Sequence, residues 1–418
     1  MKKKMVLTGI IVQAALAAML VFGIISCKDP TGTTTYTVTY TVGRGSGDVP
    51  AKQTVDEGTA ITLPNQGSMT APSDETFDGW KDGGSTAYAA GASYTVNANV
   101  TFTAQWKTSG PVRVPATTLA GALLWLGANV ADQTEYIIEL TGNESIDPQT
   151  LYFPGKAVTI TLRGGSTERT VDLYSVGSLF TVRSGVTLVL DSNITLRGIS
   201  GITDNTTSLV SVSGGTLVMN DGSKITGNSN RSSSTSSPSY GGGVYVSNGV
   251  FTMTGGTISY NEVYCPYSAY GGGVDVGNGT FTMSSGTISY NEASGQSSSG
   301  GGVDVDNGTF TMSGGTISNN RVHAIQSYGG GVSGTFTMTG GTISGNTASS
   351  ASSFGGHSSH GGGVSGSLIK TGDSTITDTN SAANGAVAYV SSSQKRETAA
   401  GPDVNLDYRV PGSSGGWE

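Results

Sequence analysis

The chain has 418 residues, of which 65 are glycine and only 12% are charged, and acidic residues outnumber basic ones by 29 to 21. The formal net charge of −8 argues against a nucleic acid partner, because phosphate backbones are bound by clustered Lys and Arg. The length allows two or three domains.

The first residues have the features of an export signal. A basic start at Lys2–Lys4 precedes an apolar run over Met5–Ile25, and the sequence Ile-Ile-Ser-Cys then ends at Cys27. This ending resembles the lipobox of bacterial lipoproteins, which implies a signal peptide over 1–26, a membrane-anchoring lipid on Cys27 and a tether over 27–35. The alternative is an uncleaved transmembrane anchor, because the run approaches the roughly 18 to 20 residues that span a bilayer. Both interpretations predict export.

The sequence pattern of residues 36–107 differs from that of the rest of the chain. Tyr36 and Val38 begin an alternation typical of a half-buried strand, and Trp80 and Trp106 are large enough to centre a small core. The segment resembles the internalin B-repeat module of bacterial surface proteins in the motifs GDVP from Gly47, VDEGT from Val55, FDGW from Phe77 and AQW from Ala104. The resemblance implies a β-grasp-like surface spacer or contact module without known chemistry. The tryptophans could instead grip a sugar, but core packing is the favoured use.

Residues 108–150 are interpreted as a linker and an N-terminal cap. The sequence TTLAGALLWLGANV carries leucines at helical spacing, at Leu119, Leu123, Leu124 and Leu126. A short amphipathic helix here would cover the open end of the array that follows, which otherwise invites edge-to-edge association.

A glycine-rich phrase recurs in the second half of the chain. It begins with GGGV at Gly241, Gly271, Gly300, Gly329 and Gly361, so successive copies start 30, 29, 29 and 32 residues apart. A period of this length is typical of stacked supersecondary units rather than of independent domains.

Each copy contains three short runs with a period of two, which in the first copy surround Val244, Phe251 and Ile258. This period predicts strands and excludes a solenoid of helices. Asn-Gly and Gly-Gly pairs between the runs allow the positive φ angles of sharp corners. Three strands and three corners per copy, stacked at about 4.8 Å, predict an all-β fold: a right-handed parallel β-helix over 151–395, followed by a tail over 396–418.

Each clear copy also ends in Ile-x-x-Asn. The asparagines that recur at this corner are Asn228, Asn261, Asn291, Asn320 and Asn346. Amides at one corner of successive coils can hydrogen-bond to their neighbours, so we predict an internal ladder. The alternative, that they are only turn formers, explains five asparagines in register less well than it explains one.

The Gly-Gly-Gly-Val and Ile-x-x-Asn pair resembles the GGA(I/V/L) and FxxN motifs of polymorphic outer-membrane proteins, which are surface adhesins. Isoleucine stands where those proteins have phenylalanine, at Ile258, Ile288, Ile317 and Ile343. The resemblance implies a solenoid on a cell surface more strongly than it implies adhesion.

One carboxylate pair requires a test for chemistry. Asp275 and Asp304 occupy the same position in adjacent copies and alternate with valines, so we expect them on an outward, solvated face with Asp306 nearby. Such a pair could bind a cation or act as acid and base. The face offers no cationic partner for an acidic glycan, so we expect no catalytic residue, no cofactor and no metal site.

The histidines and the second cysteine do not change this expectation. His323, His357 and His360 lie in serine- and glycine-rich segments and are interpreted as exposed loop residues. Cys265 has no basic neighbour to activate it and no disulfide partner if Cys27 is lipidated.

The segments between each ladder asparagine and the next glycine triplet vary in length. They have 12, 9, 8, 8 and 14 residues, at 229–240, 262–270, 292–299, 321–328 and 347–360. We expect loops along one edge, replaceable by Gly-Ser without loss of fold. Their aromatic residues among serines are candidate ligand contacts: Tyr240, Tyr264, Tyr267, Tyr270, Tyr328 and Phe354. The alternative is that these segments are linkers with scattered aromatics.

The sequence as a whole predicts an exported, lipid-anchored protein of the outer membrane or cell surface. Its expected role is a non-catalytic binding or adhesion scaffold, with a host or matrix protein or a glycan as partner. The alternative is a β-helix polysaccharide lyase or hydrolase acting on surface or matrix glycans.

Overall fold

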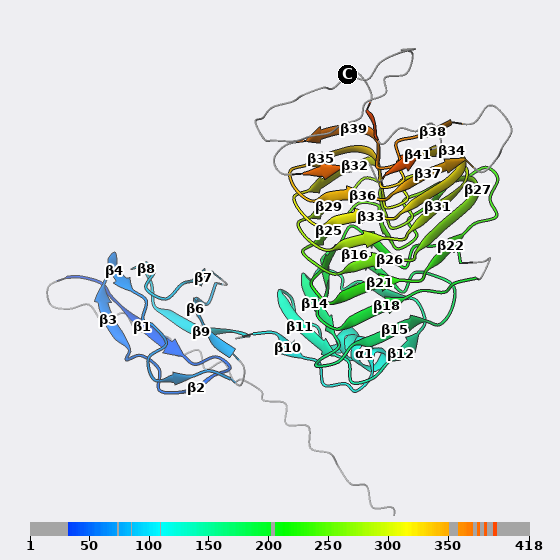
Figure 1. The fold of residues 1–418 in the computed structure, drawn as a ribbon. Helices are drawn as coiled ribbons and strands as arrows, with labels where there is room; N and C mark the ends of the chain where they lie inside the picture. Colours follow the sequence, from blue (N-terminus) through cyan, green and yellow to red (C-terminus); the bar gives the residue numbers. More distant parts are fainter. Residues whose placement is uncertain are drawn as a thin grey trace, which may run out of the picture. The chain divides into compact units, whose positions relative to one another are not determined.

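The computed structural model describes residues 32–390 except 73–74, 85, 109, 202–204, 351–357, 371–373, 377–379 and 383–387. The chain divides between Gly110 and Pro111 into two compact units (Figure 1). The predicted signal peptide, Cys27, Phe354 and the predicted C-terminal tail lie outside the described residues.

The first unit is a small β module. Its five-stranded sheet has the order β3-β1-β9-β6-β7, with β1 at Thr35–Thr41, β3 at Gln53–Asp56, β6 at Glu75–Lys81, β7 at Ala87–Tyr88 and β9 at Val100–Thr108. Two further pairs join β2 (Ser46–Gly47) to β5 (Met69–Thr70) and β4 (Thr59–Thr62) to β8 (Ser93–Val96). Strands β1 and β9 are parallel, and the other pairs are antiparallel.

Both tryptophans of the module are used in its core. Trp80 and Trp106 are buried with Val38, Tyr40 and Phe102. The Trp80 indole N–H donates to the Pro64 carbonyl at 2.7 Å, and that of Trp106 donates to the Val42 carbonyl at 2.8 Å. Because their rings are buried and their polar atoms are satisfied, these tryptophans stabilise the module and do not form a sugar platform.

Helix α1 (Leu119–Asn129) lies at the N-terminal end of the second unit (Figure 1). The Thr118 hydroxyl caps it by accepting from the Gly121 N–H. Leu119 and Leu126 are buried in the same core as the coils that follow, as the capping prediction requires. Leu124 is exposed, although the sequence predicted it on the same face as the other leucines. It lies five positions after Leu119, and at 3.6 residues per turn this places it on nearly the opposite side of the helix.

The second unit is a parallel β-solenoid, as predicted, built from three sheets. The wide sheet contains β10 (Val112–Arg113), β11 (Thr134–Glu139), β13 (Gln149–Leu151), β14 (Val158–Arg163), β16 (Phe180–Arg183), β17 (Val186–Leu190), β19 (Val210–Ser213), β20 (Thr216–Met219), β24 (Val244–Val246), β25 (Val250–Met253), β28 (Val274–Val276), β29 (Thr280–Met283), β32 (Val303–Met312), β35 (Val332–Met338), β39 (Val364–Lys370) and β42 (Ala388–Val390).

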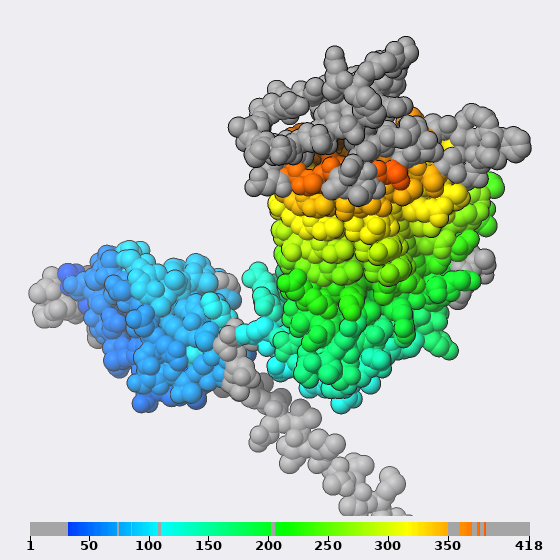
Figure 2. Space-filling view, in the orientation of Figure 1, coloured from blue at the N-terminus to red at the C-terminus, as the bar shows by residue number. Residues whose placement is uncertain are grey.

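The narrow sheet contains β12 (Glu144–Ile146), β15 (Arg169–Leu173), β18 (Ile194–Arg197), β21 (Ser223–Thr226), β26 (Thr257–Ser259), β30 (Thr287–Ser289), β33 (Thr316–Ser318), β36 (Thr342–Ser344) and β40 (Thr375–Ile376). The side sheet contains β22 (Ser229–Arg231), β23 (Ser239–Tyr240), β27 (Glu262–Tyr270), β31 (Glu292–Ser299), β34 (Arg321–Tyr328), β37 (Thr347–Ser350), β38 (Ser358–His360) and β41 (Ser381–Ala382). Successive coils follow one another along the unit in sequence order (Figure 2). Parallel pairing already includes β11, so the segment expected to be only linker and cap also supplies strands of the first coils.

Identical residues of neighbouring copies meet in the core. Phe251, Phe281, Phe310 and Phe336 are register partners and stack at 4.5, 4.7 and 5.5 Å between ring centroids. Methionine and isoleucine columns run beside them and are fully buried. The repeated phrase therefore places the same side chain at the same depth in each coil, which gives the solenoid a continuous core.

The glycine triplet of the phrase forms a tight corner between the side sheet and the wide sheet. Gly271 has a φ of +66°, and a Cβ there would lie 2.4 Å from the Val274 carbonyl oxygen. A Cβ on Gly272 would lie 2.4 Å from the carbonyl oxygen of Gly301 in the next coil. Only glycine allows both the bend and the close stacking of corners, which explains why the triplet recurs.

Three of the segments predicted to be loops, 262–270, 292–299 and 321–328, are strands over their whole length, and the expectation was wrong for them. Only the two ends of 229–240 are strands. Strands β27, β31 and β34 pair in parallel along most of their length. Each of these segments is therefore an excursion that extends laterally from its coil and stacks on the equivalent segment of the next coil. The excursion has its own small core, formed by Val263, Cys265, Ala269, Ala293, Val322 and Ala324. Segments of 9, 8 and 8 residues pair along most of their length, whereas the 12-residue segment 229–240 pairs with β27 only through its two ends, β22 and β23.

Candidate functional site

The asparagines predicted to form a ladder lie inside the corner between the narrow and side sheets, each at most 1% exposed. Amide-to-amide bonds join Asn261 to Asn291 at 3.0 Å, Asn291 to Asn320 at 2.9 Å and Asn320 to Asn346 at 3.0 Å. Asn228 is joined through its backbone N–H, which donates to Asn261 Oδ1 at 3.2 Å. The ladder is a structural element, because its polar atoms are used within the fold.

The ladder is longer than predicted. Asn346 Nδ2 donates to Asn380 Oδ1 at 2.9 Å, and Asn205 Nδ2 donates to Asn228 Oδ1 at 3.1 Å. Asn380 was not predicted as part of the ladder because the pattern before it is Ile-x-x-x-Asn and not Ile-x-x-Asn. Asn205 follows the expected spacing but lies outside the clearly repeated phrase.

Two columns of side chains face each other across the glycine triplets, and we name this place the tyrosine–aspartate corner. The returning strands of the side sheet contribute Tyr240, Tyr270, Ser299, Tyr328 and His360. The wide sheet contributes Tyr245, Asp275, Asp304, Ser333 and Ser365. Facing members are five residues apart in the chain: the Tyr240 and Tyr245 rings stack at 5.5 Å, and the Ser299 hydroxyl donates to Asp304.

The two aspartates are buried, contrary to the expectation of a solvated face. Asp275 is 0% exposed and Asp304 is 6% exposed, because the unexpected returning strands cover the wide sheet here. Among the described residues, neither carboxylate oxygen of Asp275 has a hydrogen-bond partner. Burial, followed by the charges of Asp304 and Asp306, raises the pKa of Asp275 well above its usual value.

Asp304 is in register with Asp275 in the next coil and has a similar environment. Burial raises the pKa of Asp304 to about 6, although hydrogen bonds from Ser299 and Ser333 favour its charged form. The described residues contain no cluster of three or more His, Cys, Asp or Glu side chains suited to a metal ion. The pair therefore has the raised pKa of an acid catalyst but lies beneath its neighbours, where a bound substrate would not reach it.

The other predicted contact residues have mixed positions. Tyr240, Tyr270 and Tyr328 are half-buried in the tyrosine–aspartate corner. Tyr264 lies beneath Arg231, whose guanidinium is 4.6 Å from the ring centroid. Tyr267 is exposed at the tip of the side sheet.

His323, His360 and Cys265 also lie in the side sheet. His323 is on β34, where its Nδ1 lies 3.1 Å from the Ser349 hydroxyl, and His360 is on β38, where burial lowers the pKa of its ring. They are therefore strand residues, not the exposed loop residues that we expected, and His357 lies outside the described residues. Cys265 is buried, and its thiol donates to the carbonyls of Ser234 and Ser237.

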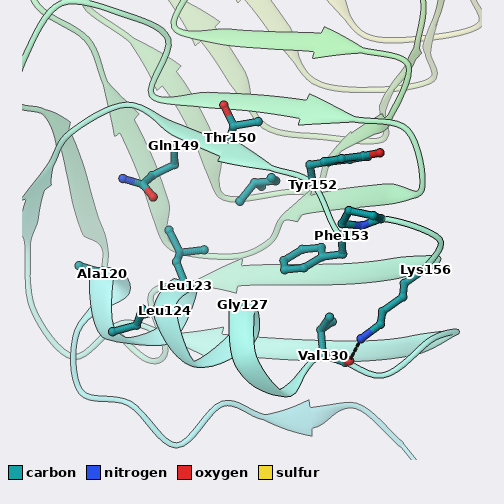
Figure 3. Close-up of a pocket in the computed structure, with 12 residues that line it drawn as sticks. Ala120, Leu123, Leu124, Gly127, Val130, Gln149, Thr150, Tyr152, Phe153 and Lys156 are labelled. Carbon is teal, nitrogen blue, oxygen red and sulfur yellow. Dashed lines mark hydrogen bonds between the residues drawn. The ribbon is translucent and has the colours of Figure 1, made fainter.

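A cavity of about 530 Å³ lies between helix α1 and the segment after β13 (Figure 3). Leu123, Leu124 and Phe153 line it with apolar surface, and Tyr152 lies at its edge. The Lys156 ammonium, which also lines it, donates to the Val130 carbonyl. Gln149 and Thr150 add neutral polar groups to the lining, and its ammonium group is already bonded to Val130, so the cavity does not define a ligand chemistry.

The sequence comparison identifies the first unit. Residues 36–105 match the Listeria-Bacteroides repeat domain. The match confirms a surface-type repeat module at the predicted place and indicates a surface or extracellular protein. Comparisons with curated proteins and with solved structures find no match. In the described part of the chain, no helix is long and apolar enough to cross a membrane.

Proposed function

We propose that the chain is an exported, lipid-anchored surface protein whose solenoid is a non-catalytic binding scaffold. The observation that carries the proposal is the in-register repetition of the outer faces. Outward threonines recur at Thr252, Thr282, Thr311 and Thr337, directly above one another in adjacent coils. A rigid surface with one chemical pattern per coil suits a repetitive ligand or a fixed spacing between partners.

An array of glycans and extracellular-matrix proteins tests this function with the full chain and with a variant that lacks residues 36–107. Binding that persists in the variant assigns contact to the solenoid. Binding that disappears assigns it to the repeat module and leaves the solenoid as a stalk. Absence of binding to both ligand classes contradicts the scaffold function.

A second candidate is a glycan-degrading enzyme, favoured by the in-register pair of Asp275 and Asp304 with its raised pKa values. The burial of both carboxylates opposes it. Release of reducing or unsaturated ends from acidic glycans, lost in Asp275→Asn and Asp304→Asn variants, would favour the enzyme over the scaffold.

A further inference from the structure

Tyr260 and Tyr290 form an exposed aromatic pair at the corner between the narrow and side sheets. They follow the register partners Ser259 and Ser289, and their rings are nearly parallel, 4° apart with centroids at 5.2 Å. The side chains remain 65% and 53% exposed. Sequence reasoning missed them because they lie just before the ladder asparagines and outside the supposed loops.

The backbone at these positions is unfavourable for tyrosine. Both residues have a φ of +56°, in the left-handed region. The same column has Gly227, Asn319 and Gly345, also at positive φ, and glycine and asparagine adopt this conformation readily. A bulky residue there costs about 1 kcal/mol, so the tyrosines are not explained by the needs of the corner.

The stack has one open end. The preceding coil has Gly227 at this position and the coil before it has Gly198, so no side chain from the column covers the Tyr260 face that is turned away from Tyr290. The two coils with glycine at this position leave about 10 Å of space along the stacking direction. A ligand ring stacked on Tyr260 requires a separation of about 3.5–4 Å from it, so the space is sufficient. Beside this space, Arg197 is paired with Asp172, which supplies hydrogen-bonding groups.

We propose that this face of Tyr260, supported by Tyr290, binds a sugar ring of a neutral glycan. The C–H face of a pyranose carries partial positive charge and contacts the negative face of an aromatic ring. Glu292 follows Tyr290 by two residues, and the chain has a net charge of −8, so polyanions are disfavoured, while Glu262 near Tyr260 is paired with Arg231. Two tyrosines among serines and threonines are also too small an apolar surface for a protein interface of about 800 Å² per partner.

This ligand class rests on the binding role proposed above, and it is tested by affinity electrophoresis through gels containing xyloglucan, galactomannan or polygalacturonate. We expect a neutral polysaccharide to retard the full chain and the Tyr260→Asn/Tyr290→Asn variant to bind at least tenfold more weakly. Because asparagine is the natural residue at position 319 of this column, the variant should melt at the same or a higher temperature. A loss of binding without a loss of stability separates a contact role from a structural one.

Two single variants locate the contact. Gly227→Tyr places a ring over the open face of Tyr260 while both tyrosines remain, and it should abolish binding. A Cβ there meets only Arg197 Cγ, at 3.6 Å, and the φ of +68° adds the same strain of about 1 kcal/mol that Tyr260 and Tyr290 already carry. Tyr152→Asn removes an exposed tyrosine beside helix α1 and should leave binding unchanged.

Three results would overturn the proposal. They are binding within twofold of the parent in Tyr260→Asn/Tyr290→Asn or in Gly227→Tyr, the absence of retardation by both neutral polysaccharides, and tyrosine-dependent binding of polygalacturonate or of a matrix protein. In the first and third cases the scaffold function survives, because the chain still binds a ligand. In the second case the array decides whether the scaffold function survives.

Discussion

Asn291 donates both its backbone N–H and its side-chain amide to one oxygen, Asn320 Oδ1, at 3.0 and 2.9 Å. Its own Oδ1 receives the same two bonds from Asn261, at 3.0 Å each. Each rung therefore fixes the backbone of the coil before it as well as its side chain. This arrangement couples neighbouring coils through buried groups that water does not reach.

Removal of one rung should destabilise the solenoid strongly. Asn291→Ala leaves two buried Asn261 donors without an acceptor, and each unsatisfied group costs about 1–3 kcal/mol. We expect a loss of about 3 kcal/mol in the free energy of unfolding, measured by urea denaturation. The control is Asn319→Gly, a neighbouring asparagine at positive φ, which should change stability by less than about 0.5 kcal/mol. Equal effects of the two changes would contradict a stabilising role for the ladder.

The side sheet should prove necessary for stability. Val263 is fully buried in its small core, so Val263→Ser removes apolar contacts and buries a hydroxyl, which should cost about 2 kcal/mol. Tyr267→Ser changes an exposed residue of the same strand and serves as control. Thermal melting followed by circular dichroism measures both. A Val263→Ser variant as stable as the control would restore the interpretation of these segments as loops.

The course of the chain in the coils could be predicted because the same signal occurs in every copy. Valine, phenylalanine and isoleucine recur at fixed offsets from Gly241, Gly271 and Gly300, and parallel in-register stacking follows from that repetition. The side sheet was missed because its alternation is carried by small residues such as Ala293, Cys265 and Ala324, among many serines. Composition suggested loops there, while similar segment lengths permitted pairing.

The same omission misplaced the aspartates. The alternation Val274-Asp275-Val276 correctly placed Asp275 outside the solenoid core. A side chain outside the core is not necessarily exposed to solvent, and Asp275 is buried. The returning strand covers that face, and a second layer of structure cannot be inferred from the period of the first. Tyr260 and Tyr290 carried a readable signal, since tyrosine stands directly before a ladder asparagine where another copy has glycine.

Lipidation is tested at the N-terminus. Cys27→Ala should abolish incorporation of a labelled fatty acid and leave the precursor unprocessed or cleaved elsewhere, because the thiol is the acceptor of the lipid. Metabolic labelling and the mass of the mature chain measure this outcome, with Cys265→Ala as the matched control that should retain the label. A mature chain of unchanged mass with unmodified Cys27 would instead favour the transmembrane anchor.

The tyrosine–aspartate corner should make stability depend on pH in an unusual direction. A carboxyl whose pKa is higher in the folded chain than in the unfolded chain holds its proton more tightly when folded. Well below pH 4 Asp304 is protonated in both states and carries no penalty. Between about pH 4 and 6 the unfolded chain has lost the proton that the folded chain still holds, so the free energy of unfolding falls, and it levels off above about pH 6. Asp275, whose pKa burial raises in the same direction, adds to this fall.

We therefore expect the solenoid to melt at a higher temperature at pH 5 than at pH 7.5. From the usual value of about 3.9, the shift of Asp304 corresponds to about 3 kcal/mol over the whole titration, at about 1.4 kcal/mol per pH unit. Asp304→Asn keeps an oxygen that accepts from Ser299 but has no charge, so it should raise the melting temperature at pH 7.5 and flatten the profile. Asp221→Asn, at an exposed carboxylate, should leave the profile unchanged. A parent profile that rises from pH 5 to 7.5, or an Asp304→Asn profile as steep as that of the parent, would show that the buried pair does not govern stability in this range.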